Sequence, residues 1–155
     1  MDGLSRLFRP RSVAVFGGWW AENVIEQCLK AGFDGDIWPV HPKRDEIHGI
    51  PCFRSLSELP SAPDAAFLGI NRHAVIEVTA ELAAMGCGGA VCFASGFAET
   101  GDDDLQQQLV EAAGDMPLLG PNCTTASVSR QRGRATRARG GPPSRARPSP
   151  RRAPR

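Results

Sequence analysis

Short apolar segments alternate with amphipathic helical segments over the first 123 residues, and this alternation constrains the fold more than any other feature of the sequence. Residues 12–16 (SVAVF) are rich in β-branched side chains and end at a glycine pair, and residues 21–31 then carry apolar side chains on one helical face. Further strands are predicted over 36–40, 65–70, 89–93 and 117–119, with helices over 74–85 and from 102 onward. This pattern predicts an α/β fold, a doubly wound parallel sheet with right-handed crossovers.

Four loops follow predicted strands directly, at residues 17–20, 40–44, 70–73 and 94–97. Ligands of an open parallel sheet bind outside the carboxyl ends of its strands, where these loops meet. Gly17 and Gly18 would let backbone N–H groups approach a phosphate at the start of the next helix. Asn71 is the predicted N-cap of the helix that follows it. The candidate cofactor-binding residues are Gly17, Gly18, Trp19, Lys43, Asn71, Arg72, Ser95, Gly96 and Phe97.

Five segments, in order along the chain, carry a resemblance to a known family. They are LFRPRSVAVFGG, GFDGDIWPVHPKRDEIHGIPCFRSLSELP, APDAAFLGI, GGAVCFASGFAE and LLGPNC, across roughly residues 7–123. Together they resemble the CoA-binding domain that opens NDP-forming acyl-CoA synthetases and, more distantly, the α subunit of succinyl-CoA ligase. The resemblance implies a Rossmann-like domain with coenzyme A as its cofactor.

The resemblance also implies a role for several residues. Gly17 and Gly18 would lie under the CoA pyrophosphate, and Lys43 would face the 3′-phosphate of the CoA adenosine. Ser95 and Gly96 would line the path of the pantetheine arm. The first loop departs from the family in being short and in carrying bulky indoles, Trp19 and Trp20, which would pack on the adenine or close the site.

Catalysis in this family needs groups that lie beyond the GPNC motif: a phosphohistidine and an ATP-grasp module. His41, His48 and His73 match no catalytic position of the family. The resemblance therefore implies a module of an acyl-CoA synthetase that binds CoA or acyl-CoA but carries no catalytic residue of its own. A separate ligase or ATP-grasp chain is its implied partner.

The charges divide the chain into two unlike parts. Residues 1–123 hold 8 Lys and Arg against all 17 Asp and Glu, whereas residues 124–155 hold 10 Arg and no acid. The second part also lacks aromatic residues and is predicted to be disordered, because it cannot bury enough apolar surface to offset its ordering entropy. We therefore expect a lead-in over 1–11, the Rossmann-like domain over 12–123 and a basic tail over 124–155, whose composition is that of a frameshifted or truncated product.

Two other functions fit parts of the sequence. One is a dinucleotide-binding protein, in which Lys43 and Arg44 would meet the 2′-phosphate of NADP, although the G-x-G-x-x-G spacing is absent. The other is nucleic-acid binding through the arginines of the tail, which the acidic domain would oppose.

The cysteines and the apolar segments bear on metal binding and location. The five cysteines form no C-x-x-C pair, so no metal site is predicted and reduced thiols are expected. No apolar run is long enough to span a bilayer and no secretory signal opens the chain. These features predict a cytoplasmic protein without a membrane partner.

Overall fold

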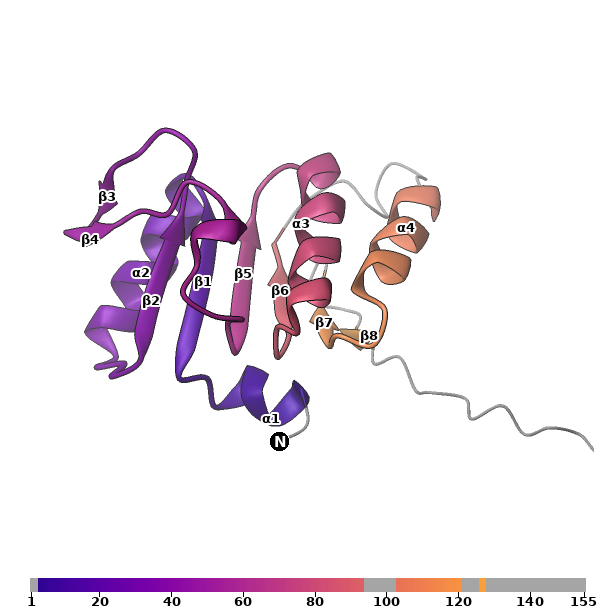
Figure 1. Cartoon of the computed structure of the whole chain (residues 1–155), viewed down its shortest axis with the longest axis horizontal. Helices are drawn as coiled ribbons and strands as arrows, with labels where there is room; N and C mark the ends of the chain where they lie inside the picture. The colour runs from indigo at the N-terminus through magenta and orange to yellow at the C-terminus, as the bar shows by residue number, and fades with distance from the viewer. Residues whose placement is uncertain (1–2, 94–102, 121–125, 128–155) are drawn as a thin grey trace, which may run out of the picture.

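A six-stranded sheet with the order β2-β1-β5-β6-β7-β8 forms the centre of the molecule, and a computed structural model describes it through residues 3–93, 103–120 and 126–127 (Figure 1). Its strands are β1 (Ser12–Gly17), β2 (Asp36–Val40), β5 (Ala65–Gly69), β6 (Ala90–Cys92), β7 (Leu118–Leu119) and β8 (Ala126–Ser127). The first five pair in parallel. Because β2 and β5 flank β1 on opposite sides, the winding of the chain reverses at β1.

Helices cover both faces of this sheet, as the alternation of segments predicts. The helix α2 (Trp19–Lys30) packs on one face, where Ile25 contacts the cluster that includes Val15 of β1. The helices α3 (Arg72–Met85) and α4 (Asp103–Ala113) lie together on the other face, which Phe16 of β1 enters. Successive residues of β1 therefore belong to different cores, which is the expected pleat of a strand buried on both faces. The doubly wound α/β fold is confirmed.

The connection from β2 to β5 contains an antiparallel hairpin of β3 (Glu46–Ile47) and β4 (Ile50–Pro51), which the sequence does not indicate. The 3₁₀ turn η1 (Leu56–Glu58) follows it, and it confirms the helical turn that the sequence predicts over residues 55–59. His48 and Gly49 have φ of 51° and 78° and make the tight turn between the two short strands. A further parallel bridge joins Val40 to Phe53. This segment is therefore held against the carboxyl end of β2.

Three element boundaries differ from the prediction. The first long helix begins at Trp19, so Trp19 and Trp20 form its first turn and not a loop. The third helix begins at Arg72, two residues earlier than expected, because Asn71 caps it there. The strand β8 pairs antiparallel to β7 and lies beyond the predicted end of the domain at Cys123, so the sheet is not parallel throughout.

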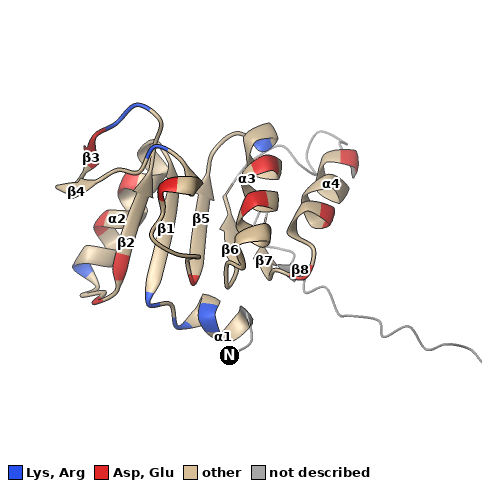
Figure 2. Cartoon of the chain, viewed as in Figure 1, with Lys and Arg blue, Asp and Glu red and all other residues tan. Residues whose placement is uncertain are grey.

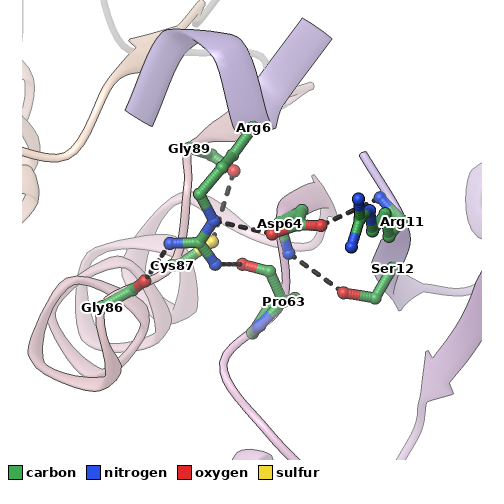
Figure 3. A network of polar contacts seen from close by, with 8 residues as sticks. All are labelled: Arg6, Arg11, Ser12, Pro63, Asp64, Gly86, Cys87 and Gly89. Carbon is green, nitrogen blue, oxygen red and sulfur yellow. Dashed lines mark hydrogen bonds and ion pairs between the residues drawn. The ribbon is translucent and has the colours of Figure 1, made fainter. Parts of the chain in front are cut away.

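A helix, α1 (Gly3–Phe8), lies within the predicted lead-in and is attached at the amino ends of the strands (Figure 3). The guanidinium of Arg6 donates to Asp64 Oδ1 at 2.6 Å and to the carbonyl oxygen of Gly86 at 2.8 Å. The other carboxylate oxygen of Asp64 accepts from the backbone N–H of Arg11 at 2.9 Å. This network joins α1, the start of β1, the start of β5 and the end of α3, at the opposite end of the sheet from the loops discussed next.

The network also sets the ionisation of Asp64. Burial alone would raise the pKa of this carboxyl, but hydrogen bonds from Arg6 and from the backbone of Arg11 outweigh it and hold the pKa below its ordinary value. Asp64 is therefore charged at neutral pH and paired with a charged partner.

No helix in the described part of the chain combines the length and the hydrophobicity that a bilayer span requires.

Candidate functional site

A cavity of about 520 Å³ opens at the carboxyl ends of β1, β2 and β5. Its walls come from residues 16–18 after β1, 40–42 after β2, 54–56 around the 3₁₀ turn, 69–71 after β5, and one side of α3. This is the point at which the winding of the sheet reverses, where open α/β sheets bind their ligands. We call this cavity the crevice.

The floor of the crevice depends on two glycines that lie against each other. Gly17 and Gly69 are paired in the β1–β5 register, and Gly17 has a φ of 130°. A Cβ atom on Gly17 would collide with the carbonyl oxygen of Gly69. A Cβ atom on Gly69 would in turn lie 3.3 Å from the carbonyl oxygen of Phe16. Side chains are therefore excluded here, and a ligand can approach the backbone.

The start of α2 faces the same cavity. Gly18 is the N-cap of α2 and offers no side chain to bond the free N–H groups of the first turn. Those groups and the helix dipole favour an anion at this end of the helix. Gly18 lines the crevice, so the phosphate-binding position predicted for Gly17 and Gly18 lies at its edge.

Asn71 closes the side of the crevice at the start of α3. Its Oδ1 accepts hydrogen bonds from the backbone N–H groups of His73 at 3.1 Å and Ala74 at 3.0 Å. The predicted N-cap is confirmed. Asn71 lines the crevice, whereas Arg72, the next residue, is half-buried and is not one of the lining residues.

The loop after β2 carries the predicted cation, Lys43, and is shaped by its own first residue. The ring Nδ1 of His41 accepts from the backbone N–H groups of both Lys43 and Arg44, each at 3.1 Å. Arg44 then forms an ion pair with Glu22 of α2. Among the described residues, the ammonium of Lys43 has no such partner. Lys43 is exposed beside the crevice and is free to bind an anion.

A second arginine holds the other end of this loop. The guanidinium of Arg54 donates to the carbonyl oxygens of Pro42 at 3.3 Å and Arg44 at 3.0 Å, and it pairs with the carboxylate of Asp45. Arg54 also lines the crevice. Sequence reasoning missed this residue, because only the pairing of Val40 with Phe53 brings it beside the loop. Figure 2 shows the basic residues of the loop between β2 and β3 in blue, next to the acidic residues that lead into β3.

The structure brings together only part of the predicted set. Gly17, Gly18 and Asn71 line one cavity, with Lys43 on the adjoining loop. Trp19 is 64% exposed and lies outside the crevice, with its ring edge-on to that of Trp20. The predicted residues Ser95, Gly96 and Phe97 lie outside the described part of the chain.

The thiols and carboxylates show no arrangement for metal binding in the part of the chain that the structure describes. No three His, Cys, Asp or Glu side chains gather there. Burial raises the pKa of the Cys28, Cys52 and Cys87 thiols, which keeps these groups protonated at neutral pH.

Comparison with known proteins assigns the fold to a family. The family described as "CoA binding domain" matches residues 11–128. A trans-feruloyl-CoA synthase from an unknown prokaryotic organism is 39% identical over 129 residues, which are 77% of this chain and 18% of the relative. The α subunit of ADP-forming acetate–CoA ligase II from Pyrococcus furiosus is 30% identical over 131 residues, which are 77% of this chain and 28% of the subunit.

A solved structure gives the same result. The dinucleotide-forming acetyl-coenzyme A synthetase 1 of Ca. Korarchaeum cryptofilum, in complex with phosphate and ADP, superposes with a TM-score of 0.73 at 32% identity. The alignment covers 79% of this chain and 28% of that one, so the chain spans less than a third of these relatives. The resemblance found in the sequence is confirmed. The chain belongs to the CoA-binding domain family and is homologous to the N-terminal domains of NDP-forming acyl-CoA synthetases.

Proposed function

We propose that this chain binds coenzyme A or an acyl-CoA in the crevice. The observation that carries the proposal is the cavity itself, in which the side-chain-free backbone of Gly17 and Gly18 adjoins a loop whose Lys43 has no partner among the described residues. An uncapped helix start beside a basic loop suits a ligand with a pyrophosphate and a further phosphate. Coenzyme A has both.

The ligand's groups are assigned to the crevice as follows. The pyrophosphate lies over Gly17 and Gly18, and the adenosine lies beside the end of β2 with its 3′-phosphate toward Lys43. Arg54 and His41 support this arrangement by fixing the loop that carries Lys43. The pantetheine arm then leaves past Asn71, along the path that the family resemblance assigns to Ser95 and Gly96.

The reaction to which this binding contributes is the formation of a thioester by an acid–CoA ligase. Relatives of this chain are named as CoA synthases and ligases, and the chain spans less than a third of their length. Two matched relatives are named as α subunits. We therefore assign this chain a binding role, with the catalytic groups supplied by a separate ligase or ATP-grasp chain.

Four thiols in the described residues are free, which supports a reducing, cytoplasmic location.

Titration calorimetry of the full chain with CoA, dephospho-CoA and NADP tests the proposal. We expect CoA to bind and dephospho-CoA to bind at least about 10-fold more weakly, because it lacks the phosphate that Lys43 would bond. NADP is expected to bind weakly, because Arg44, the second cation predicted to meet its 2′-phosphate, is paired with Glu22. Absence of CoA binding, or tighter binding of NADP, would contradict the proposal.

The variant Lys43→Met separates the role of this residue from the site as a whole. It should bind CoA and dephospho-CoA with equal affinity. The matched control is Lys30→Met, because Lys30 lies at the far end of α2 and pairs with Glu26. Unchanged preference for CoA in Lys43→Met would exclude Lys43 as the phosphate ligand while leaving CoA binding intact.

A further inference from the structure

A second groove lies on the other face of the sheet, between α2 and the strands β5 and β6. It has a volume of about 560 Å³ and is lined mainly by Trp20, Val24, Cys28, Phe33, Phe67 and Phe93. The remaining lining residues are neutral, so no charged side chain borders it among the described residues. Its size is within the range of small-molecule sites, which are mostly apolar. We call it the aromatic groove.

The rings at the mouth of this groove form a continuous series. The centroids of Trp19 and Trp20 are 4.6 Å apart, those of Trp20 and Phe93 4.7 Å, and those of Phe67 and Phe93 6.2 Å. Trp20 and Phe93 are nevertheless 47% and 44% exposed. Contiguous exposed rings mark binding surfaces far more often than single exposed apolar residues do.

This exposure follows from the winding of the sheet. The helices α3 and α4 both pack on the face that Phe16 and Leu68 enter, whereas Phe67 points to the α2 face. On that second face, α2 is the only described helix, and it packs mainly beside β1, β2 and β5. The ring of Phe93 is therefore left uncovered by any described element.

The aromatic groove and the crevice share no lining residue, but they approach each other where Gly69 lies beside Trp20. Gly69 lines the crevice, and a Cβ atom placed on it would lie 3.4 Å from Cβ of Trp20, which lines the groove. The adenosine end of the proposed ligand lies beside β2, which is the edge strand of the sheet. A long ligand that follows the carboxyl ends of the strands from β2 crosses β1 and then reaches β5 and β6, beside which Trp20 and Phe93 contact each other.

We propose that the aromatic groove receives the acyl group of an acyl-CoA and prefers a flat aromatic acyl group to a small aliphatic one. The inference rests on the proposed function, because the crevice must hold the nucleotide for the arm to reach the groove. An incoming ring can stack on Trp20 or Phe93 or meet them edge-on, as these rings already meet one another. An acetyl group is too small to cover them.

Calorimetric titration of the full chain with CoA, acetyl-CoA and benzoyl-CoA tests this selectivity. We expect benzoyl-CoA to bind about 5- to 10-fold more tightly than acetyl-CoA, the range that one additional aromatic contact supplies. Equal affinities for the two thioesters, with CoA binding intact, would overturn this inference alone. Failure of all three compounds to bind would overturn the proposed function and the inference with it.

Two variants show whether the selectivity comes from the groove. Trp20→Leu keeps an apolar side chain but removes the ring, and it should bring the affinity ratio of benzoyl-CoA to acetyl-CoA close to one. Trp20→Phe retains a ring and should retain most of the preference, which guards against a general loss of packing. Phe8→Ala is the matched control, because Phe8 is an aromatic residue with 67% exposure on α1, at the opposite end of the sheet. A preference that survives in Trp20→Leu, or is lost equally in Phe8→Ala, would contradict the assignment.

Discussion

Two neighbouring glycines at the crevice have different structural requirements. Gly17 has a φ of 130° and no room for a Cβ atom, whereas a Cβ atom on Gly18 would meet nothing within 4 Å. Gly17 therefore allows the backbone conformation at the end of β1, and Gly18 leaves the N–H groups at the start of α2 without a capping side chain. The sequence shows a glycine pair after a strand, but only the packing of β1 against β5 distinguishes the two.

Substitution of these glycines by alanine tests the distinction. Gly17→Ala should lower the free energy of unfolding by roughly 2–4 kcal/mol, because it adds a steric collision to a backbone conformation that alanine disfavours. Gly18→Ala should change it by less than about 1 kcal/mol. Urea denaturation of both variants measures the two values. Equal losses of unfolding free energy in the two variants would contradict the close approach of Gly17 to Gly69.

Single residues of the site were predictable to different degrees. Asn71 was identifiable because an N-cap is a local signal, and its hydrogen bonds confirm it. Arg54 was not, since its partners Pro42 and Arg44 are 12 and 10 residues away and come beside it through the pairing of Phe53 with Val40. Trp20 was expected to pack on the adenine or to close the site, but α2 begins two residues earlier than predicted and the ring of Trp20 contacts that of Phe93.

At the scale of elements, α1 is attached to the sheet by the buried side chain of Leu7 and by the polar contacts of Arg6. Arg6 and Asp64 are separated by 58 residues, and their side chains are 28% and 18% exposed. Hydrogen bonds hold the pKa of Asp64 below its ordinary value despite burial, so the pair stabilises the fold while Asp64 is charged. That contribution is complete above the ordinary pKa of an aspartate and is lost as the pH falls through the lowered pKa of the folded state.

The variant Asp64→Asn tests this contribution and its sign. At pH 7 it should be less stable than the wild type by about 1–2 kcal/mol, because charged hydrogen bonds from Arg6 and Arg11 are lost. The difference should shrink as the pH is lowered below about 3.8, the ordinary pKa of aspartate. Urea denaturation from pH 7 to pH 2 measures it. Glu26→Gln, which removes an exposed pair with Lys30, is the control and should show little effect. If the stability difference between Asp64→Asn and the wild type stayed constant from pH 7 to pH 2, the contribution assigned to charged Asp64 would be contradicted.

The elements that alternate along the chain were predictable from the sequence, whereas three of the two-residue strands were not. The strand β2 has the predicted bounds, and the other parallel strands and the three long helices agree to within two residues where the structure describes them. The strands β3, β4 and β8 have two residues each, too few to show an alternating pattern. Their positions are determined by pairing with segments distant in sequence, which composition alone does not reveal.

In the molecule as a whole, the two ends of the sheet carry different structural features. The amino ends carry the Arg6–Asp64 network, and the carboxyl ends carry the crevice with its basic loop (Figures 2 and 3). The two faces are also unequal, since α3 and α4 share one face and leave part of the other open beside α2. This asymmetry places the crevice and the aromatic groove near each other, an arrangement that would suit the proposed ligand with its charged end and its apolar end.

The central claim, that CoA binds in the crevice, is tested most directly by following backbone amide resonances during a CoA titration of the full chain. The amides of Gly17, Gly18 and Lys43 should shift and saturate together with one Kd, while those of Arg6 and Asp64 at the other end of the sheet stay unchanged. Saturable shifts confined to these carboxyl-end loops would support the account. A titration that leaves Gly17 and Gly18 unmoved at saturating CoA, or that moves only residues elsewhere, would contradict it.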